Sequence, residues 1–246
     1  MSYELNKEIE QFVLSKDTPY TKEDMVYVNQ YVGYGGMWNK EASLKKERGL
    51  YEYYTPIDLV EKMVGLAVKH GYKNGAVLEP SCGVGRFLHY FNPKIKVVGI
   101  EMDQVSCLIA KANFPSFEIR YQTFNELFTD RKGNSIPRNQ SFDLVIGNPP
   151  YGSFSGKFTR TEKRITRANN YVEYFISRGL DMLNKGGLLI YVIPSSYLDG
   201  NTNVVKEAIS KKGSLIDAYR LPVGIFSQTS IQTDIIVYKK QSNEAN

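Results

Sequence analysis

The chain has 246 residues and a net charge of +5. Its hydrophobic content of 42% suffices for a packed core, so disorder is not the default. No apolar run approaches the roughly 18 residues that cross a bilayer, and the start, MSYELNKEIEQF, lacks the basic flank and apolar stretch of a signal peptide. We expect a soluble, cytoplasmic protein that does not contact a membrane. Two cysteines and two histidines are too few for a disulfide framework or a metal site, so we expect no metal.

The first part of the chain predicts two helices. One covers Glu4–Leu14, and the second begins near Thr21, where Thr21 and Asp24 have the spacing of a capping box. A third helix is predicted to run to about residue 70, with Pro56 in its first turn. We interpret residues 1–50 as a helical N-terminal appendage.

Beyond this appendage, short apolar runs alternate with amphipathic stretches, which is typical of an α/β domain with a parallel sheet. Seven strands are predicted, at residues 76–79, 96–101, 117–121, 142–147, 188–194, 215–221 and 233–239. We expect helices after the first, second, fourth and fifth strands. The last two strands are too close for a helix between them and predict a hairpin at the sheet edge. The domain covers 51–240, and 241–246 is a frayed tail.

A glycine turn follows the first strand in the segment VLEPSCGVGRF, residues 77–87. Gly83 and Gly85 allow the backbone to approach a ligand closely, although such a pair also serves turns with a purely conformational role. Glu101 ends the next strand about 20 residues later, where a carboxylate can accept hydrogen bonds from both ribose hydroxyls. Together these residues predict a nucleoside-binding site.

The charge at the glycine turn indicates which nucleoside binds. Glu79 would repel the pyrophosphate of a dinucleotide, which needs a helix N-terminus free of negative charge. The same carboxylate suits the ammonium or sulfonium group of S-adenosylmethionine. The alternative is that Glu79 is a solvated loop charge.

The fourth strand leads directly into the sequence Asn148-Pro149-Pro150-Tyr151. Two prolines fix the backbone at the carboxyl edge of the sheet, where ligands bind. The side-chain oxygen of Asn148 and the carbonyl of Pro149 can accept the two hydrogens of an aromatic exocyclic amine, which frees its lone pair to attack a methylsulfonium. Tyr151 offers a ring for stacking a planar substrate. The alternative is a turn that ends a buried strand, with Tyr151 in the core.

These motifs resemble those of the S-adenosylmethionine-dependent DNA adenine methyltransferases in which the cofactor motif comes first. The segments NYVEYF from Asn170 and IPSSYL from Ile193 are similar to later motifs of that family. The resemblance covers roughly residues 51–240 and includes methylase segments fused to large helicases in mobile elements. It implies an α/β fold, a Rossmann-like seven-stranded methyltransferase sheet with a reversed last strand.

The resemblance also implies a set of cofactor-binding residues, namely Thr55, Pro56, Glu79, Cys82, Gly83, Gly85, Glu101, Met102 and Asn148. By this resemblance the glycine turn wraps the methionine part, Glu101 holds the ribose and Met102 packs on the adenine. Many relatives carry an acidic residue after the third strand, where this chain offers Gln122, Thr123 or Asn125 instead.

The same motif occurs in enzymes that methylate adenine in DNA, bases in RNA, or glutamine in release factors. We predict adenine in DNA as the substrate, in the setting of restriction-modification. An RNA base and a protein glutamine amide are alternatives, as is a cofactor-binding subunit of a modification complex.

A basic segment follows the catalytic motif. Residues 152–170 hold five basic residues against one acid, Glu162, which accounts for +4 of the net charge of +5. The basic residues are Lys157, Arg160, Lys163, Arg164 and Arg167. We expect them to contact phosphates beside a flipped base, although charge runs are usually solvated surface. Phe226 is a candidate for stacking on that base, or it packs on the sheet. Because only six residues follow Lys240, we expect weak, salt-sensitive and poorly sequence-selective DNA binding, unless a partner protein supplies sequence recognition.

Overall fold

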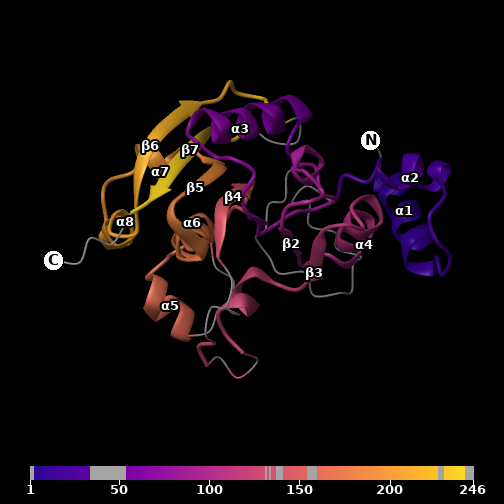
Figure 1. The fold of residues 1–246 in the computed structure, drawn as a ribbon, viewed down its shortest axis with the longest axis horizontal. Helices are drawn as coiled ribbons and strands as arrows, with labels where there is room; N and C mark the ends of the chain where they lie inside the picture. Colours follow the sequence, from indigo (N-terminus) through magenta and orange to yellow (C-terminus); the bar gives the residue numbers. More distant parts are fainter. Residues whose placement is uncertain are drawn as a thin grey trace.

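The computed structural model of the chain describes residues 3–33, 54–130, 132, 134–136, 141–153, 160–226 and 230–241. For residues 3, 160, 161 and 163 it describes the backbone alone. Within these residues the chain forms a twisted sheet with helices on both faces (Figure 1).

The sheet has seven strands in the order β3-β2-β1-β4-β5-β7-β6. The strands are β1 Val77–Glu79, β2 Val97–Glu101, β3 Glu118–Tyr121, β4 Phe142–Gly147, β5 Leu183–Pro194, β6 Gly213–Arg220 and β7 Thr233–Lys240. The first five pair in parallel, whereas β7 is antiparallel to both β5 and β6. The predicted reversed last strand is therefore confirmed, as is the hairpin, with β6 at the edge.

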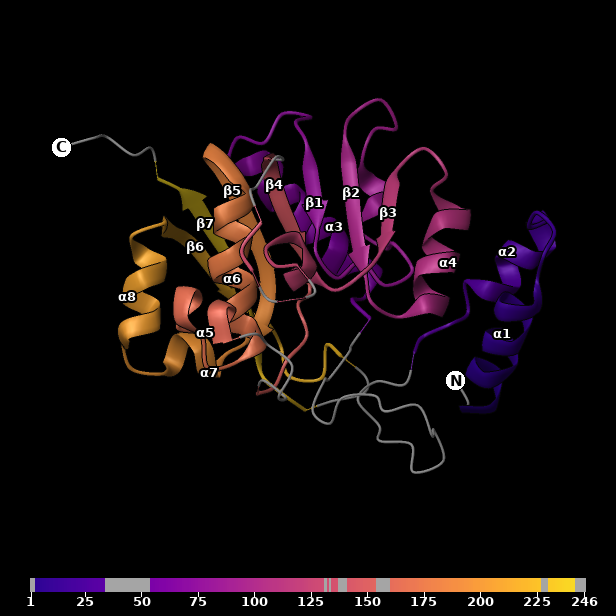
Figure 2. The ribbon, with the colours of Figure 1, turned by 90° about the horizontal axis from the view of Figure 1, so that it is seen from below.

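The helices are α1 Tyr3–Ser15, α2 Lys22–Val28, α3 Ile57–Lys69, α4 Gln104–Asn113, α5 Arg160–Thr166, α6 Tyr171–Met182, α7 Ser196–Asp199 and α8 Val204–Ser210. Figure 2 shows α1 and α2 stacked outside α4 at one end of the molecule, with α8 at the other. Among the described helices, none is long and apolar enough to cross a membrane.

Local sequence explains where most elements begin. At α2, the Thr21 amide donates to Asp24 at 2.7 Å and the Asp24 amide donates to the Thr21 hydroxyl at 3.1 Å, so the predicted capping box is confirmed. Asp103 caps α4 and Asn170 caps α6, because their side chains accept from the amides of Ser106 and Glu173. Pro56 is the N-cap of α3, one position before the predicted first turn.

One predicted helix and the start of one predicted strand were wrong. The chain after β1 forms turns and a single 3-10 turn at Leu88–Tyr90 instead of a helix, because Gly83 and Gly85 adopt positive φ angles of 53° and 91° that interrupt helical geometry. The fifth strand begins at Leu183, where it pairs with Phe142, five residues earlier than expected.

The helical appendage shares a hydrophobic core with the rest of the chain. Side chains of α1 and α2 form one cluster with residues of the glycine turn and of α4, namely Ile9, Val13, Val28, Tyr31, Val84, Val105 and Ile109. The predicted boundary at residue 50 and most of the tail lie outside the described residues. Helices α1 and α2 nevertheless pack on the glycine turn through Val84.

Candidate functional site

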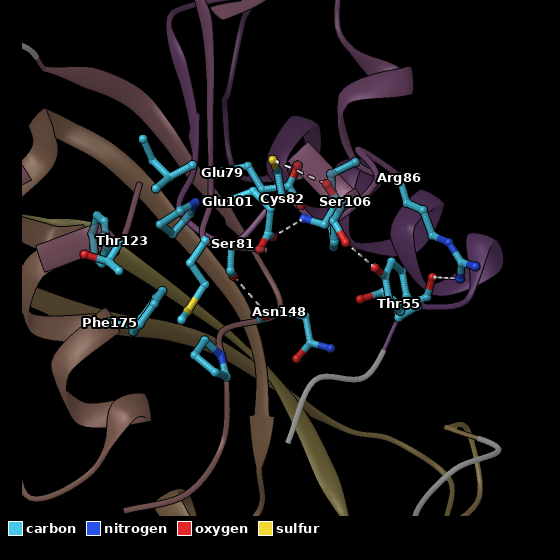
Figure 3. A pocket seen from close by; sticks show the side chains of 18 of the residues that line it. Thr55, Glu79, Ser81, Cys82, Arg86, Glu101, Ser106, Thr123, Asn148 and Phe175 are labelled. Atoms are coloured by element: carbon cyan, nitrogen blue, oxygen red, sulfur yellow. Dashed lines mark hydrogen bonds between the residues drawn. The ribbon is translucent and has the colours of Figure 1, made fainter. Parts of the chain in front are cut away.

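A cavity opens at the carboxyl ends of β1, β2 and β4. This edge is where parallel α/β sheets bind ligands. The cavity brings together most of the residues that the sequence predicts for cofactor and catalysis, namely Thr55, Glu79, Cys82, Gly83, Glu101, Met102, Asn148 and Pro150 (Figure 3).

Glu79 ends β1 with only 2% of its surface exposed. Its Oε2 atom has no hydrogen-bond partner among the described residues. Burial, and to a lesser extent repulsion by Glu101, raises the pKa of Glu79 well above its usual value. The alternative of a solvated loop charge is therefore wrong, and the cavity wall presents an unsatisfied carboxylate oxygen.

Glu101 is held rigidly at the end of β2. One carboxylate oxygen accepts from the Gly83 amide at 2.8 Å and the other from the Asp103 amide at 2.6 Å. Both bonds come from backbone amides of the surrounding turns. The carboxylate is thus fixed on the cavity wall.

The two glycines of the turn have different surroundings. Gly83 lines the cavity, and a Cβ atom there would lie 3.1 Å from the Tyr54 ring. At Gly85 a Cβ atom would lie 2.5 Å from the ring of Phe114, and Gly85 is not part of the cavity wall. The structure therefore does not bring Gly85 to the cavity wall, where the sequence predicts it. This glycine allows the turn to pack against Phe114.

The remaining predicted cofactor residues lie around the same wall. Thr55 is buried and its carbonyl accepts from the Arg86 guanidinium at 2.9 Å, whereas Pro56 lies outside the wall. Met102 is 43% exposed and free to cover a ligand. Cys82 is a buried thiol whose pKa is raised by burial. Of the candidates after β3, Gln122 and Thr123 reach the cavity, whereas Asn125 does not.

The catalytic motif is divided between the cavity and the core. Asn148 lines the cavity, and its carbonyl accepts from the Ser81 hydroxyl at 3.1 Å, which ties the two turns together. Pro149 is buried outside the wall. Tyr151 is 2% exposed and its hydroxyl donates to the Val192 carbonyl at 3.3 Å, so its ring belongs to the core. The expectation of an exposed stacking face on Tyr151 is wrong in this structure.

The basic segment is partly helical. Arg164 and Arg167 are exposed in and just after α5, while Arg160 and Lys163 are described by backbone alone and Lys157 lies outside the described residues. Glu162, the one acid of the segment, is fully buried and paired with Arg178 and with the Tyr174 hydroxyl of α6. The described part of the segment at residues 160–166 is thus a helix anchored on α6. Phe226 is buried in the core, so the packing alternative describes its position.

Sequence reasoning missed several cavity residues, namely Tyr54, Ser81, Arg86, Ser106, Phe124 and Phe175. The rings of Phe124 and Phe175 lie 4.9 Å apart and form an apolar end of the cavity. Phe175 lies within the segment NYVEYF, which the resemblance singled out without giving this residue a role. Ser81 and Arg86 likewise lie within the segment VLEPSCGVGRF, which the sequence analysis used without giving these two residues a role. Tyr54, Ser106 and Phe124 reach the cavity through contacts between parts of the chain that are distant in sequence.

Comparison with known proteins identifies relatives. The family model described as N-6 DNA Methylase matches residues 33–246. The chain is 29% identical over 228 residues to the defense against restriction protein B of Escherichia phage P1, covering 91% of the chain and 9% of the phage protein. It is 27% identical over 175 residues to the modification methylase CviBIII of Paramecium bursaria Chlorella virus NC1A, covering 69% of the chain and 44% of that methylase.

Solved structures share the fold. The methyltransferase subunit of a type I restriction-modification system from Streptococcus thermophilus superposes with a TM-score of 0.62 at 20% identity, over 81% of this chain and 47% of that subunit. The chain therefore spans less than half the length of each of these three proteins.

Proposed function

The chain belongs to the N-6 DNA methylase family, and from this premise we propose that it is an adenine-specific DNA methyltransferase that transfers the methyl group of S-adenosylmethionine to the exocyclic amine of adenine. One observation carries the proposal: Asn148 lines the same cavity as Glu79, Gly83 and Glu101. An acceptor for an amine and a site for a cationic nucleoside thus meet in one place.

The residues that line the cavity suit the charged and the apolar parts of S-adenosylmethionine. The unsatisfied Oε2 of Glu79 offers a negative acceptor for the ammonium or sulfonium group of the cofactor. The Glu101 carboxylate is fixed on the cavity wall, where it can accept from the ribose hydroxyls, and the apolar pair Phe124 and Phe175 with Met102 can hold the adenine. The bound cofactor would supply an electrophilic methyl group.

Asn148 performs the chemistry on the substrate side. The lone pair of an adenine amine is delocalised into the ring, and it becomes available when acceptors hold the two amine hydrogens and draw the nitrogen toward tetrahedral geometry. The Asn148 side chain supplies one acceptor from the cavity wall. The sequence predicts the Pro149 carbonyl as the other, and this residue lies behind the wall in the structure without substrate. The Ser81 hydrogen bond keeps the Asn148 backbone in place beside the cofactor turn. The amine proton becomes acidic after methyl transfer, so the step relies on acceptors rather than on a strong base.

Transfer of tritiated methyl groups tests this function against its alternatives. The purified chain is incubated with labelled S-adenosylmethionine and, separately, with DNA, total RNA or a release factor. We expect label in DNA, at N6 of adenine. Label in RNA or protein alone would replace DNA with one of the other substrates, and binding of the cofactor without transfer to any substrate would indicate a cofactor-binding subunit.

We further propose that a partner protein contributes sequence recognition. The similarity to a type I methyltransferase subunit supports this view, because that protein acts within a restriction-modification system. Methylation of random and defined duplexes tests it, since a chain without its partner should label DNA with little sequence preference. The cytoplasmic location inferred from the sequence stays a prediction.

A further inference from the structure

The ring of Tyr54 forms part of the cavity wall between two parts of the chain. On the cavity side it faces Gly83, where a Cβ atom would lie 3.1 Å from the Tyr54 Cε1 atom. On the other side it faces Gly33, where a Cβ atom would lie 2.9 Å from Cε2. The ring is thus held between the cofactor turn and the end of the helical appendage.

Polar contacts fix the position of this ring. Its hydroxyl shares a hydrogen bond of 2.9 Å with Ser106 in the first turn of α4, and the Arg86 guanidinium lies 5.3 Å from the ring centre. The Ser106 amide donates to Asp103, whose own amide holds the Glu101 carboxylate. Tyr54 is therefore linked to the residue that is predicted to hold the ribose.

The appendage controls where Gly33 lies. Gly33 has a φ angle of 61°, a conformation that favours glycine. The buried side chain of Asn6, in α1, donates to the Gly33 carbonyl and accepts from the Val32 amide at 3.2 Å. Asn6 thereby holds this backbone against the ring of Tyr54.

We propose that α1 and α2 are part of the cofactor site, because Asn6 presses Gly33 against Tyr54 and so positions the wall of the cavity beside Gly83. This inference rests on the proposed function, since S-adenosylmethionine is the ligand. The helices that sequence reasoning treated as an appendage set the affinity for the cofactor. Tyr54 contacts the ligand, and Asn6 is a positioning residue that acts through it.

A double-mutant cycle in the full chain tests the relay, with S-adenosylmethionine binding measured by calorimetry. Tyr54→Ala removes a ring from the wall and should weaken binding roughly tenfold. Asn6→Ala should weaken it by about threefold or more, and the double variant should bind like Tyr54→Ala, because coupled residues are not additive. Glu8→Ala, at an exposed position of the same helix, is the matched control and should bind like the wild type.

Two further measurements separate positioning from loss of folding. In Asn6→Ala the KM for S-adenosylmethionine should rise by the same factor as the Kd, whereas a smaller folded fraction lowers kcat instead. Should Asn6→Ala fail to fold, Gly33→Ala perturbs the same contact from the other side and should weaken binding. Wild-type affinity in the Asn6 and Gly33 variants, or additive losses in the double variant, overturns the relay. A wild-type chain that binds no S-adenosylmethionine overturns the proposed function itself.

Discussion

Glu79 and Glu101 face one cavity from two neighbouring parallel strands, and the charge of Glu101 adds to burial in raising the pKa of Glu79. Two buried carboxylates that are both ionised cost folding free energy, because they lose water and repel each other. A cationic group beside Glu79 would lower this cost.

Replacement of Glu79 by Gln should stabilise the empty protein. The folded-state pKa of Glu79 is raised, so its contribution to stability is present at low pH and is lost as the pH rises through that pKa. The amide does not ionise and avoids this loss. We expect the melting temperature at pH 8 to rise by about 3 °C per kcal/mol of relieved cost, with a relieved cost of roughly 1–3 kcal/mol. Thermal melts at pH 5.5 and 8 check this, and a lower melting temperature at pH 8 would contradict it.

Cofactor binding should show the opposite trend with pH. The ionised form of Glu79 attracts the cationic cofactor, so the affinity for S-adenosylmethionine should fall as the pH falls through the raised pKa of Glu79. Glu79→Gln should bind about tenfold more weakly at pH 8, with a flatter pH profile. Calorimetry across pH 5.5–8.5 measures both. A wild-type profile retained in the variant would show that another group titrates.

Alanine at Gly83 and Gly85 should have separable effects. Gly83 lines the cavity, so Gly83→Ala should weaken S-adenosylmethionine binding by at least about tenfold at a modest cost in stability, roughly 1 kcal/mol for the positive φ. Gly85→Ala places a Cβ atom against the Phe114 ring and should lower the melting temperature more. Binding and melting of both variants are compared with Gly65→Ala, an open helical position. Equal effects of the two variants on binding would refute the assignment.

Replacement of Asn148 by Ala should separate catalysis from cofactor binding. The side chain is predicted to accept from the substrate amine, so turnover should fall by about 10² to 10³ while the Kd for S-adenosylmethionine changes little. Ser81→Ala removes the hydrogen bond to the Asn148 carbonyl and leaves its side chain, so its loss of turnover should be smaller. Single-turnover methylation of a duplex measures both rates. Near-normal turnover in Asn148→Ala would remove this role.

The fold could be predicted from sequence where periodicity and glycine or proline signals agree. Strand Phe142–Gly147 was predicted to the residue, because an apolar run interrupted only by Asp143 ends there at Asn-Pro-Pro. The division of Asn148 and Tyr151 between cavity and core could not be predicted, since it depends on the carbonyl of Val192 in another strand. Likewise, Tyr54 became part of the site through Gly33 and Gly83, which are distant in sequence.

In the basic segment, a tertiary contact fixes residues that the sequence predicts as part of a polar surface segment. The sequence indicated a polar loop with a single acid, whereas Glu162 is buried against Arg178 and Tyr174. Breaking such a pair leaves a buried charge and typically costs about 3–5 kcal/mol. The pair therefore anchors α5, and it sets the backbone from which Arg164 and Arg167 project.

Exposed Arg164 and Arg167 should contribute to DNA binding through phosphates, since they follow the catalytic motif at the carboxyl edge of the sheet. Each phosphate contact on duplex DNA contributes about 0.9 to the slope of log affinity against log salt. The variant Arg164→Ala/Arg167→Ala should therefore flatten that slope by about two units and leave S-adenosylmethionine binding unchanged. Fluorescence anisotropy on a labelled duplex at several salt concentrations measures the slope. Lys73→Ala/Lys94→Ala, which removes the same charge from exposed positions elsewhere, is the control and should keep the wild-type slope. If the control variant flattens the slope as much as Arg164→Ala/Arg167→Ala does, only net charge matters and DNA lies against another surface.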